Sequence, residues 1–173
     1  RDKRSAETKP VNLKGVVTHR MNVKDWERHG VCEEFDENGK LTIRDRYKND
    51  QLQGVCEEFY KNGKREEGAL KDGQRHGVSK GFYKNGKLEV RARYKNDQLH
   101  EIREKFFDNG KLLIRERYKD GQRHGVCEDF YEKGTLQTIQ HYKNCSVSGL
   151  RVALYSDGNT DTQEGTKIYT TLR

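Results

Sequence analysis

The stretch EEFYKNGK at residues 57–64 returns almost unchanged as GFYKNGK at 81–87. Two related stretches, FDNGK at 107–111 and DENGK at 36–40, have the same Asn-Gly-Lys ending. Asn-Gly after an aromatic stretch is a strong hairpin signal, because both residues tolerate positive φ angles. The recurrence of one turn along the chain therefore predicts a series of β-hairpins.

The glycines of this turn follow one another at intervals of 24, 24, 23, 24, 24 and 24 residues. They are Gly15, Gly39, Gly63, Gly86, Gly110, Gly134 and Gly158. A second series lies between them, at Gly30, Gly54, Gly77, Gly125 and Gly149, with Glu101 in the place of one glycine. A unit of this length has room for two short strands and two turns. We therefore expect an all-β protein, an elongated antiparallel β-hairpin repeat array that forms an open sheet or solenoid of about six 24-residue repeats.

Alternation along the strands assigns side chains to the two faces of the predicted sheet. In the second strand of a unit, Leu41, Ile43 and Tyr47 should share one face, with Arg44 and Arg46 on the other. The first strand alternates imperfectly, because a glutamate falls between its two apolar residues. These glutamates are Glu33, Glu57, Glu104 and Glu128. The pattern predicts either aromatic residues on both faces or a bulge near the turn.

The composition favours a thin structure. Only 31% of the 173 residues are hydrophobic and 36% are charged, too polar for an ordinary core, yet nine tyrosines and six phenylalanines argue against disorder. The net charge of +7 comes from interleaved residues of both signs, whereas a nucleic-acid binder usually concentrates its basic residues. Nucleic acid is therefore disfavoured as a partner.

Three segments follow from the extent of the repeats: a basic N-terminal arm at 1–10, the β-repeat array at 11–155, and a C-terminal capping segment at 156–173. Within the cap, KIYTTL at 167–172 is a candidate final strand. Trp26 is expected to lie over the sheet edge at the N-terminal end. Open arrays have unpaired edge strands, which favours self-association wherever a cap fails.

YKDGQRHGV at 118–126 and HGVCEEFDENGK at 29–40 resemble MORN repeats, in the variant found in YwqK-type antitoxin-like proteins of bacteria. The resemblance extends over about 11–155 and implies an elongated antiparallel β-array without an active site. One copy, at 63–77, is a residue short and has Leu70 where other copies have tyrosine. That deviation makes the local strand register uncertain.

The cysteines are predicted to be free. Cys32, Cys56 and Cys127 occupy the same repeat position, and successive hairpins should be about 10 Å apart, twice the strand spacing. A disulfide needs Cα atoms within about 7 Å. Free thiols favour a reducing intracellular compartment or a virion over secretion.

No catalytic residue, metal site or cofactor is predicted. HGVC at 29–32 and 124–127 has a zinc-like spacing, but the histidines recur with the repeat and would stand about 10 Å apart. The adjacent glutamates of CEEF point to opposite faces of a strand. A feature that recurs in every repeat makes a surface, so the chain is not expected to be an enzyme.

The predicted function is that of a structural or scaffold protein that makes protein–protein contacts along a β-repeat ribbon, in a large assembly such as a viral capsid. Aromatic residues and arginines dominate protein interfaces. The candidate partner-binding residues are Tyr60, Tyr83, Phe107, Tyr131, Tyr155, Arg44, Arg46, Arg91, Arg93, Arg115 and Arg117. Two alternatives stay open: a peripheral binder of anionic phospholipid membranes, for which MORN proteins set a precedent, and an antitoxin-like protein-binding module. The arginines can either meet lipid phosphates or pair with the glutamate rows across strands.

Overall fold

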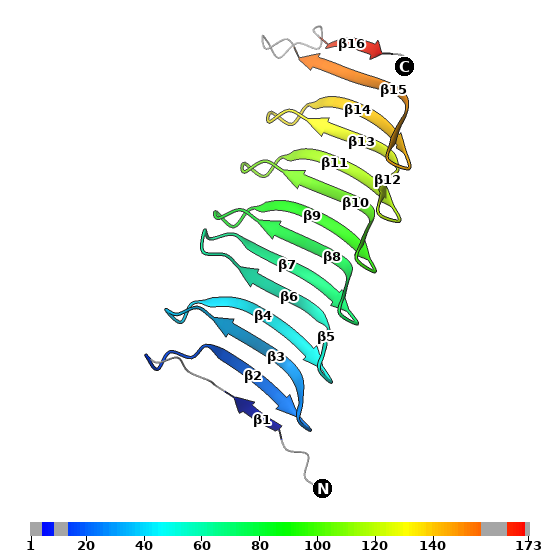
Figure 1. Ribbon diagram of the computed structural model, residues 1–173. Helices are drawn as coiled ribbons and strands as arrows, with labels where there is room; N and C mark the ends of the chain where they lie inside the picture. Colours follow the sequence, from blue (N-terminus) through cyan, green and yellow to red (C-terminus); the bar gives the residue numbers. More distant parts are fainter. Residues whose placement is uncertain (1–4, 9–13, 157–165, 172–173) are drawn as a thin grey trace. The chain divides into compact units, whose positions relative to one another are not determined.

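The structure is a computed structural model that describes residues 5–8, 14–156 and 166–171, and within these ranges it contains strands and turns but no helix (Figure 1). The chain divides into two compact units, residues 1–86 and 87–173. Each unit is an open antiparallel sheet in which consecutive strands are neighbours. The predicted fold class, an all-β array of antiparallel hairpins, is confirmed.

In the first unit the strand order is β1-β2-β3-β4-β6-β7-β8, with β5 paired to β4. The strands are β1 (Ser5–Thr8), β2 (His19–Lys24), β3 (Glu27–Phe35), β4 (Leu41–Lys48), β5 (Gln51–Leu52), β6 (Gly54–Phe59), β7 (Arg65–Lys71) and β8 (Gln74–Phe82).

In the second unit the order is β9-β10-β11-β13-β14-β15-β16, with β12 paired to β11. The strands are β9 (Leu88–Lys95), β10 (Gln98–Phe106), β11 (Leu112–Lys119), β12 (Gln122–Arg123), β13 (Gly125–Phe130), β14 (Leu136–Lys143), β15 (Ser146–Ser156) and β16 (Thr166–Thr171).

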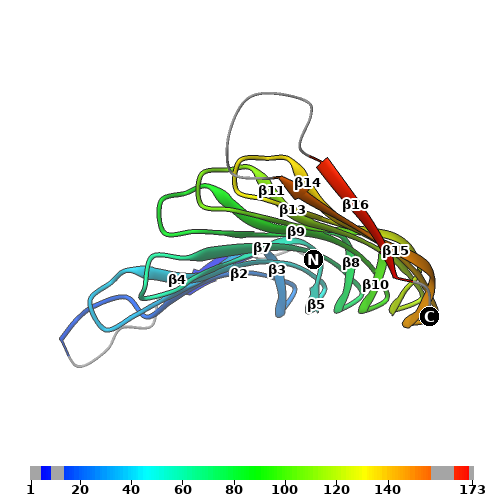
Figure 2. The same ribbon diagram turned by 90° about the horizontal axis from the view of Figure 1, so that it is seen from above.

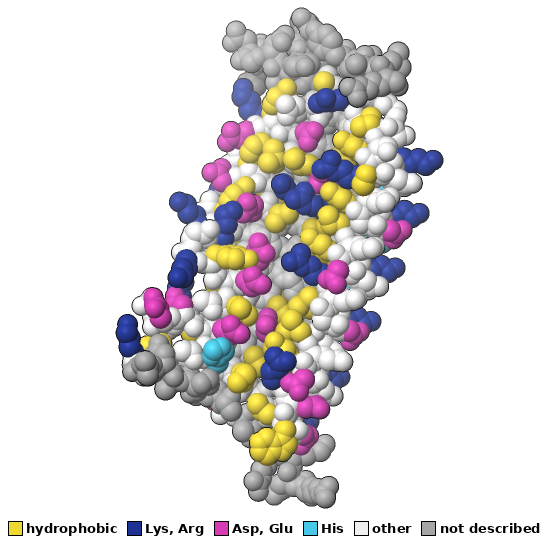
Figure 3. Space-filling view, viewed as in Figure 1, with side chains coloured by type: hydrophobic (Ala, Val, Ile, Leu, Met, Phe, Trp, Pro, Cys, Tyr) yellow, Lys and Arg dark blue, Asp and Glu magenta, His cyan; other side chains and the backbone are white. Residues whose placement is uncertain are grey.

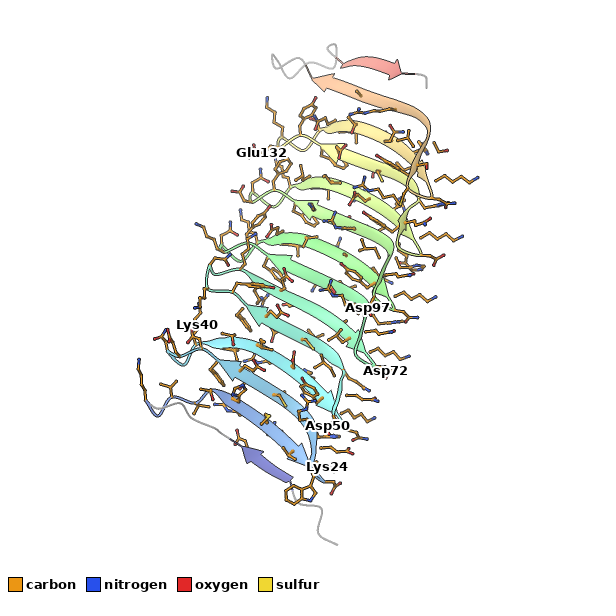
Figure 4. The ribbon with its side chains drawn as sticks, viewed as in Figure 1. Lys24, Lys40, Asp50, Asp72, Asp97 and Glu132 are labelled. Carbon is orange, nitrogen blue, oxygen red and sulfur yellow. The ribbon has the colours of Figure 1, made fainter. Side chains whose placement is uncertain are left out.

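One end of the strands carries two-residue turns of the type I′ kind. Asn49 and Asp50 both have positive φ angles, 51° and 59°, and this backbone twist matches that of the flanking strands. Such turns are also bonded to the preceding hairpin: Asp50 N donates to Arg28 O at 3.1 Å, and Gly121 N donates to Leu99 O at 2.9 Å. In the first unit Figure 4 labels Asp50 and Asp72 at this end of the strands and Lys40 at the other.

The Asn-Gly turns at the opposite end are longer than an Asn-Gly pair suggests. In the first of them, Gly39 N donates to Asp36 O at 2.9 Å, and only Gly39, with φ of 79°, is left-handed. A register shift next to this turn places Phe35 opposite Leu41, whereas Glu34 faces Ile43. Cross-strand partners share a face, so Leu41 lies with Phe35. The expected grouping of Leu41 with Ile43 was therefore wrong. A bulge near the turn, one of the two alternatives offered for the first strand, is present, but its extra residue, Thr42, lies in the second strand of the hairpin.

The short repeat loses this bulge. Between β6 and β7 the register runs without a shift, from Gly54 opposite Leu70 to Phe59 opposite Arg65. The missing residue is therefore the bulged one. As a consequence Glu67, in place of an arginine, lies opposite Glu57.

The structure corrects or limits three expectations about the ends of the array. Ser5–Thr8, inside the predicted arm, forms β1 and pairs with β2. Trp26 does not cover an edge: it occupies a two-residue turn with φ of 69° and is 96% exposed. The backbone of KIYTT forms part of β16, which pairs with β15, while Gly158 lies outside the described residues.

Very little of the molecule is buried. Among the described residues, the hydrophobic side chains classed as buried are Cys32 and Ala92. In the view of Figure 2 the strands of each unit curve and form a single layer. Backbone pairing and cross-strand side-chain contacts therefore take the place of a conventional core.

The second glycine series marks backbone positions with positive φ, and Glu101 occupies one of them with φ of 66°. Holding a residue with a Cβ in this region costs about 1–2 kcal/mol. Replacing Glu101→Gly should therefore raise the free energy of unfolding by about 1 kcal/mol, measured by urea denaturation.

The matched control is Gly125→Ala, at the equivalent position with φ of 92°, which should lower stability by a similar amount. The Arg93–Glu101 ion pair at 3.3 Å joins two side chains that are more than half exposed, so its loss should matter little. A destabilised Glu101→Gly variant would contradict this account.

Candidate interaction surface

A row of alternating charges crosses the first unit at the middle of the strands. We call it the charge ladder, and in each unit the sheet face that carries such a ladder is called the ladder face of that unit. Its cross-strand sequence is Arg20, Glu33, Arg44, Glu57, Glu67 and Lys80. Glu33 accepts from Arg20 Nη1 at 2.6 Å and from Arg44 Nε at 2.9 Å, and Arg44 Nη1 donates to Glu57 at 3.1 Å. Each of these carboxylates and guanidiniums is thus bonded across a strand boundary.

The second unit repeats the ladder as Arg91, Glu104, Arg115 and Glu128. Glu104 accepts from Arg91 Nε at 3.0 Å and from Arg115 Nε at 3.1 Å. Arg115 Nη1 also lies 3.4 Å from Glu128. The next position in the row is Ile139, where the alternation of charge ends.

Burial is uneven along the ladder. Glu104 is only 6% exposed, whereas the side chains of its partners Arg91 and Arg115 are 52% and 36% exposed. Burial raises the pKa of Glu104, but hydrogen bonds from Arg91 and Arg115 outweigh this, so the pKa lies below its ordinary value. The carboxylate therefore stays ionised under the sheet surface while the guanidiniums cover it.

The short repeat disturbs the alternation in the first unit, because Glu57 and Glu67 face each other. Arg65 compensates: its Nη2 lies 2.8 Å from Glu67 and its Nη1 lies 3.7 Å from Glu57. Lys80 Nζ approaches Glu67 at 3.7 Å, and the Arg65 guanidinium also stacks 4.3 Å above the ring of Phe82. The cation lost from the ladder is thus replaced from a neighbouring position.

The other predicted arginines lie in a second row of the ladder face. Arg46 is opposite Val31 and Arg117 is opposite Ile102. A Cβ at Gly54 would lie 3.6 Å from Arg46 Cδ, and one at Gly125 would lie 3.5 Å from Arg117 Cδ. Arg93 pairs with Glu101.

Aliphatic side chains in this row are unusually exposed. They are Val55 at 48%, Val78 at 37% and Ile102 at 36%. Alternation along each strand places them on the same face as the neighbouring ladder residues. The ladder face therefore combines paired charges with exposed apolar groups.

The predicted aromatic row is separate from the arginines. Tyr60 starts an Asn-Gly turn, is 39% exposed, and donates through its hydroxyl to Glu58 at 2.8 Å. This bond raises the pKa of Tyr60 to about 12. Glu58 alternates with the ladder residue Glu57, so Tyr60 faces the opposite side of the sheet.

The remaining members of this row differ in what can be described. Tyr83 begins an Asn-Gly turn, and its carbonyl oxygen accepts a hydrogen bond from Gly86 N. Phe107 O accepts the equivalent bond from Gly110 N. Tyr131 begins a Lys-Gly turn, in which its carbonyl oxygen accepts from Gly134 N. The Tyr155 side chain lies outside the described residues. The structure does not bring the aromatic row and the arginine rows into one site.

Sequence reasoning missed a charged cluster on the opposite face of the second unit. Glu116, 4% exposed, is paired with Arg103 at 2.6 Å and with Arg123 at 2.6 Å. One residue in the sequence could have revealed this cluster: Arg103 stands at the repeat position that Cys32 and Cys127 occupy in other copies, so a cation replaces a thiol there. Figure 3 shows basic, acidic and hydrophobic side chains interspersed on the face in view.

The cysteines are free thiols, as the spacing predicts. Burial, followed by a hydrogen bond to Asp45, raises the pKa of Cys56 to about 12. Across the residues that the structure describes, no group of three or more His, Cys, Asp and Glu side chains is arranged to hold a metal ion. In the same part of the chain, no helix has the length and apolar character needed to cross a membrane.

Comparison with known families identifies the repeat. The family model described as a MORN repeat variant matches residues 28–49, 75–96, 102–120 and 123–144. The first match spans β3 and β4 and the last spans β13 and β14, so each corresponds to one hairpin. No curated protein matches the chain.

The ladder carboxylates should be critical for stability. Glu104→Ala would leave Arg91 without its ladder partner and Arg115 with only Glu128, and should lower the free energy of unfolding by about 2 kcal/mol. Glu34→Ala is the matched control, because Glu34 is exposed on a strand of the other unit and should change stability by less than about 0.5 kcal/mol. Urea denaturation measures both, and equal effects would contradict a special role for the ladder.

The lowered pKa of Glu104 also predicts how stability depends on pH. A carboxyl whose native pKa is below its unfolded value of about 4.3 stabilises the fold above that pH, and this contribution is lost as pH falls through the native pKa. Urea midpoints of the protein and of Glu104→Gln should therefore differ at neutral pH and converge on acidification. A difference that is independent of pH would show that the charge of Glu104 is not the cause.

Proposed function

Because the chain carries MORN repeats at four places along its length, we propose that it is a non-catalytic scaffold whose ladder face binds a partner protein. MORN repeats are protein- or membrane-binding modules, and nothing in the described surface gathers reactive groups at one point. The observation that carries the proposal is the pairing of charges beside exposed aliphatic side chains. Such a surface can be covered by protein at little electrostatic cost.

The balance of charge supports a protein partner. Arg44 and Arg115 each contact two glutamates, so the guanidiniums that line the middle of the face are already neutralised. Val55 and Val78 on the ladder face of the first unit, and Ile102 on that of the second, are exposed aliphatic side chains that gain free energy when water is removed. A mixture of apolar and paired polar groups resembles the composition of non-obligate protein interfaces.

The same pairing argues against a surface dedicated to anionic lipid. A headgroup phosphate would have to compete with glutamate for each of these ladder arginines, and Arg93 in the second row also pairs with a glutamate, Glu101. Membrane binding is therefore the alternative outcome of the test and not the preferred function.

Two narrower settings are compatible with this activity. In a large assembly such as a viral capsid, the partner would be a neighbouring structural protein. In an antitoxin-like module, the partner would be an effector protein held inactive by the contact. Both settings require the same docking face, and isolation of the partner distinguishes them.

The test compares the protein with Val55→Asp combined with Val78→Asp, two exposed positions on the ladder face of the first unit. Val147→Asp is the matched control, because Val147 is 57% exposed and pairs across strands with Tyr142 on the opposite face. Cross-linking in the native source identifies the bound protein, and titration with that purified protein gives the affinity. We expect the ladder-face variant to lose about tenfold or more in affinity, or about 1.4 kcal/mol, while Val147→Asp binds normally.

The membrane alternative is measured with vesicles of phosphatidylserine and phosphatidylcholine. The proposal predicts no sedimentation with these vesicles at physiological salt. It fails if the protein binds vesicles under that condition and the ladder-face variant leaves protein binding unchanged.

A further inference from the structure

We propose that the Asn38–Gly39 peptide is a site of spontaneous deamidation, set apart from the other Asn-Gly turns of the chain by the hydrogen bonds of Asp36. The sequence contains four Asn-Gly pairs, at 38–39, 62–63, 85–86 and 109–110. Asn-Gly is the pair most prone to this reaction, because glycine has no side chain to hinder the approach of its nitrogen to the asparagine. The inference is independent of any binding partner.

In two of these turns the asparagine side chain is held by the backbone. Asn62 Oδ1 accepts a hydrogen bond from Lys64 N at 3.0 Å, and Asn109 Oδ1 accepts one from Lys111 N at 2.9 Å. Asn109 Nδ2 also approaches the carbonyl of Glu132 at 3.5 Å. These bonds fix the carboxamide in an Asx-turn geometry. Its carbon must leave that geometry before the next backbone nitrogen can attack it.

The first turn uses a different acceptor. Asp36 Oδ1 accepts from Lys40 N at 2.9 Å and from Asn38 N at 2.9 Å. Lys40 N is the counterpart of Lys64 N and Lys111 N, so the donor that holds the other asparagines is already occupied. Within the described part of the chain, the exposed carboxamide of Asn38 has no hydrogen bond of this kind.

The cause lies in one residue of the repeat. The turn begins with Asp36 here and with Tyr60, Tyr83 or Phe107 in the other Asn-Gly copies. An aromatic side chain cannot accept the two backbone N–H groups that the aspartate takes. Hydrogen bonds from Lys40 and Asn38 lower the pKa of Asp36, so the carboxylate remains ionised as an acceptor at neutral pH.

The reaction needs only water. The Gly39 backbone nitrogen loses its proton and bonds to Cγ of Asn38, the Cγ–Nδ2 bond breaks, and ammonia leaves with that proton. The resulting succinimide adds one water molecule at either carbonyl and opens to aspartate or isoaspartate. The proton transfer requires release of the bond from Gly39 N to Asp36 O, which the other turns share, so the freedom of the carboxamide determines the difference in rate.

The product changes the turn in two ways. A new carboxylate at residue 38 joins those of Asp36 and Glu37 in the same turn, and neighbouring like charges repel one another. The isoaspartate form also inserts a methylene into the backbone of a turn whose closure depends on Gly39. Deamidation would therefore loosen the hairpin of β3 and β4 and leave the other Asn-Gly hairpins unaltered.

The test follows deamidation of the full chain by peptide mapping and mass spectrometry during incubation at mildly alkaline pH. We expect Asn38 to react roughly fivefold faster than Asn62 and Asn109, the factor that one net hydrogen bond contributes. In concentrated urea the rates should become similar, because the distinction belongs to the folded turn.

Asp36→Tyr is the decisive variant, because it restores the residue found in the equivalent position of the turn at 60–64. It frees Lys40 N to bond Asn38 Oδ1, and should slow Asn38 to the rate of Asn62. Equal rates in the folded protein, or a fast Asn38 in Asp36→Tyr confirmed as folded by circular dichroism, would overturn the proposal. A rate difference that persists in urea would also overturn it, since neighbouring sequence would then be the cause.

Discussion

A carboxylate withdrawn from water must be compensated by charge and hydrogen bonds, and in this protein that requirement organises the middle of the sheet. Glu33 and Glu104 are both less than 10% exposed, and each is bonded to arginines from the strands on either side. The guanidiniums stay partly in water, so the full cost of burying an ion pair is avoided. The ladder thus ties neighbouring strands together in a sheet whose described residues bury few hydrophobic side chains.

The short repeat shows how strongly this pattern is tied to strand register. Loss of one residue removes a bulge and exchanges an arginine for Glu67 in the ladder, and a guanidinium from Arg65 then restores the balance. The turns tolerate such changes because each is a local structure with its own backbone bonds. Repeat proteins of this kind are stabilised mainly by contacts between neighbours, which confines the effect of the deletion to adjacent strands.

The same arrangement bears on function. In the part of the chain that the structure describes, chemically similar groups recur along rows, so under the proposed function affinity for a partner would come from many modest contacts spread over several hairpins. Paired charges give the face specificity more than strength, while the exposed valines and isoleucine supply apolar area. The site at Asn38 has a different basis, since it depends on a single departure from the repeat consensus at Asp36.

The sequence alone determined the repeat length, the hairpin fold, the positions of both turns and the free state of the cysteines, because these depend on local turn chemistry and on a fixed spacing between copies. It also indicated that arginines and glutamates would meet across strands. Only the tertiary structure decided that Leu41 lies with Phe35, that Tyr60 and the arginines occupy different faces, and that Trp26 is exposed in a turn. The reason is physical: one bulged residue reverses the facing of every side chain beyond it, and a count of residues between glycines does not reveal on which strand the extra residue lies.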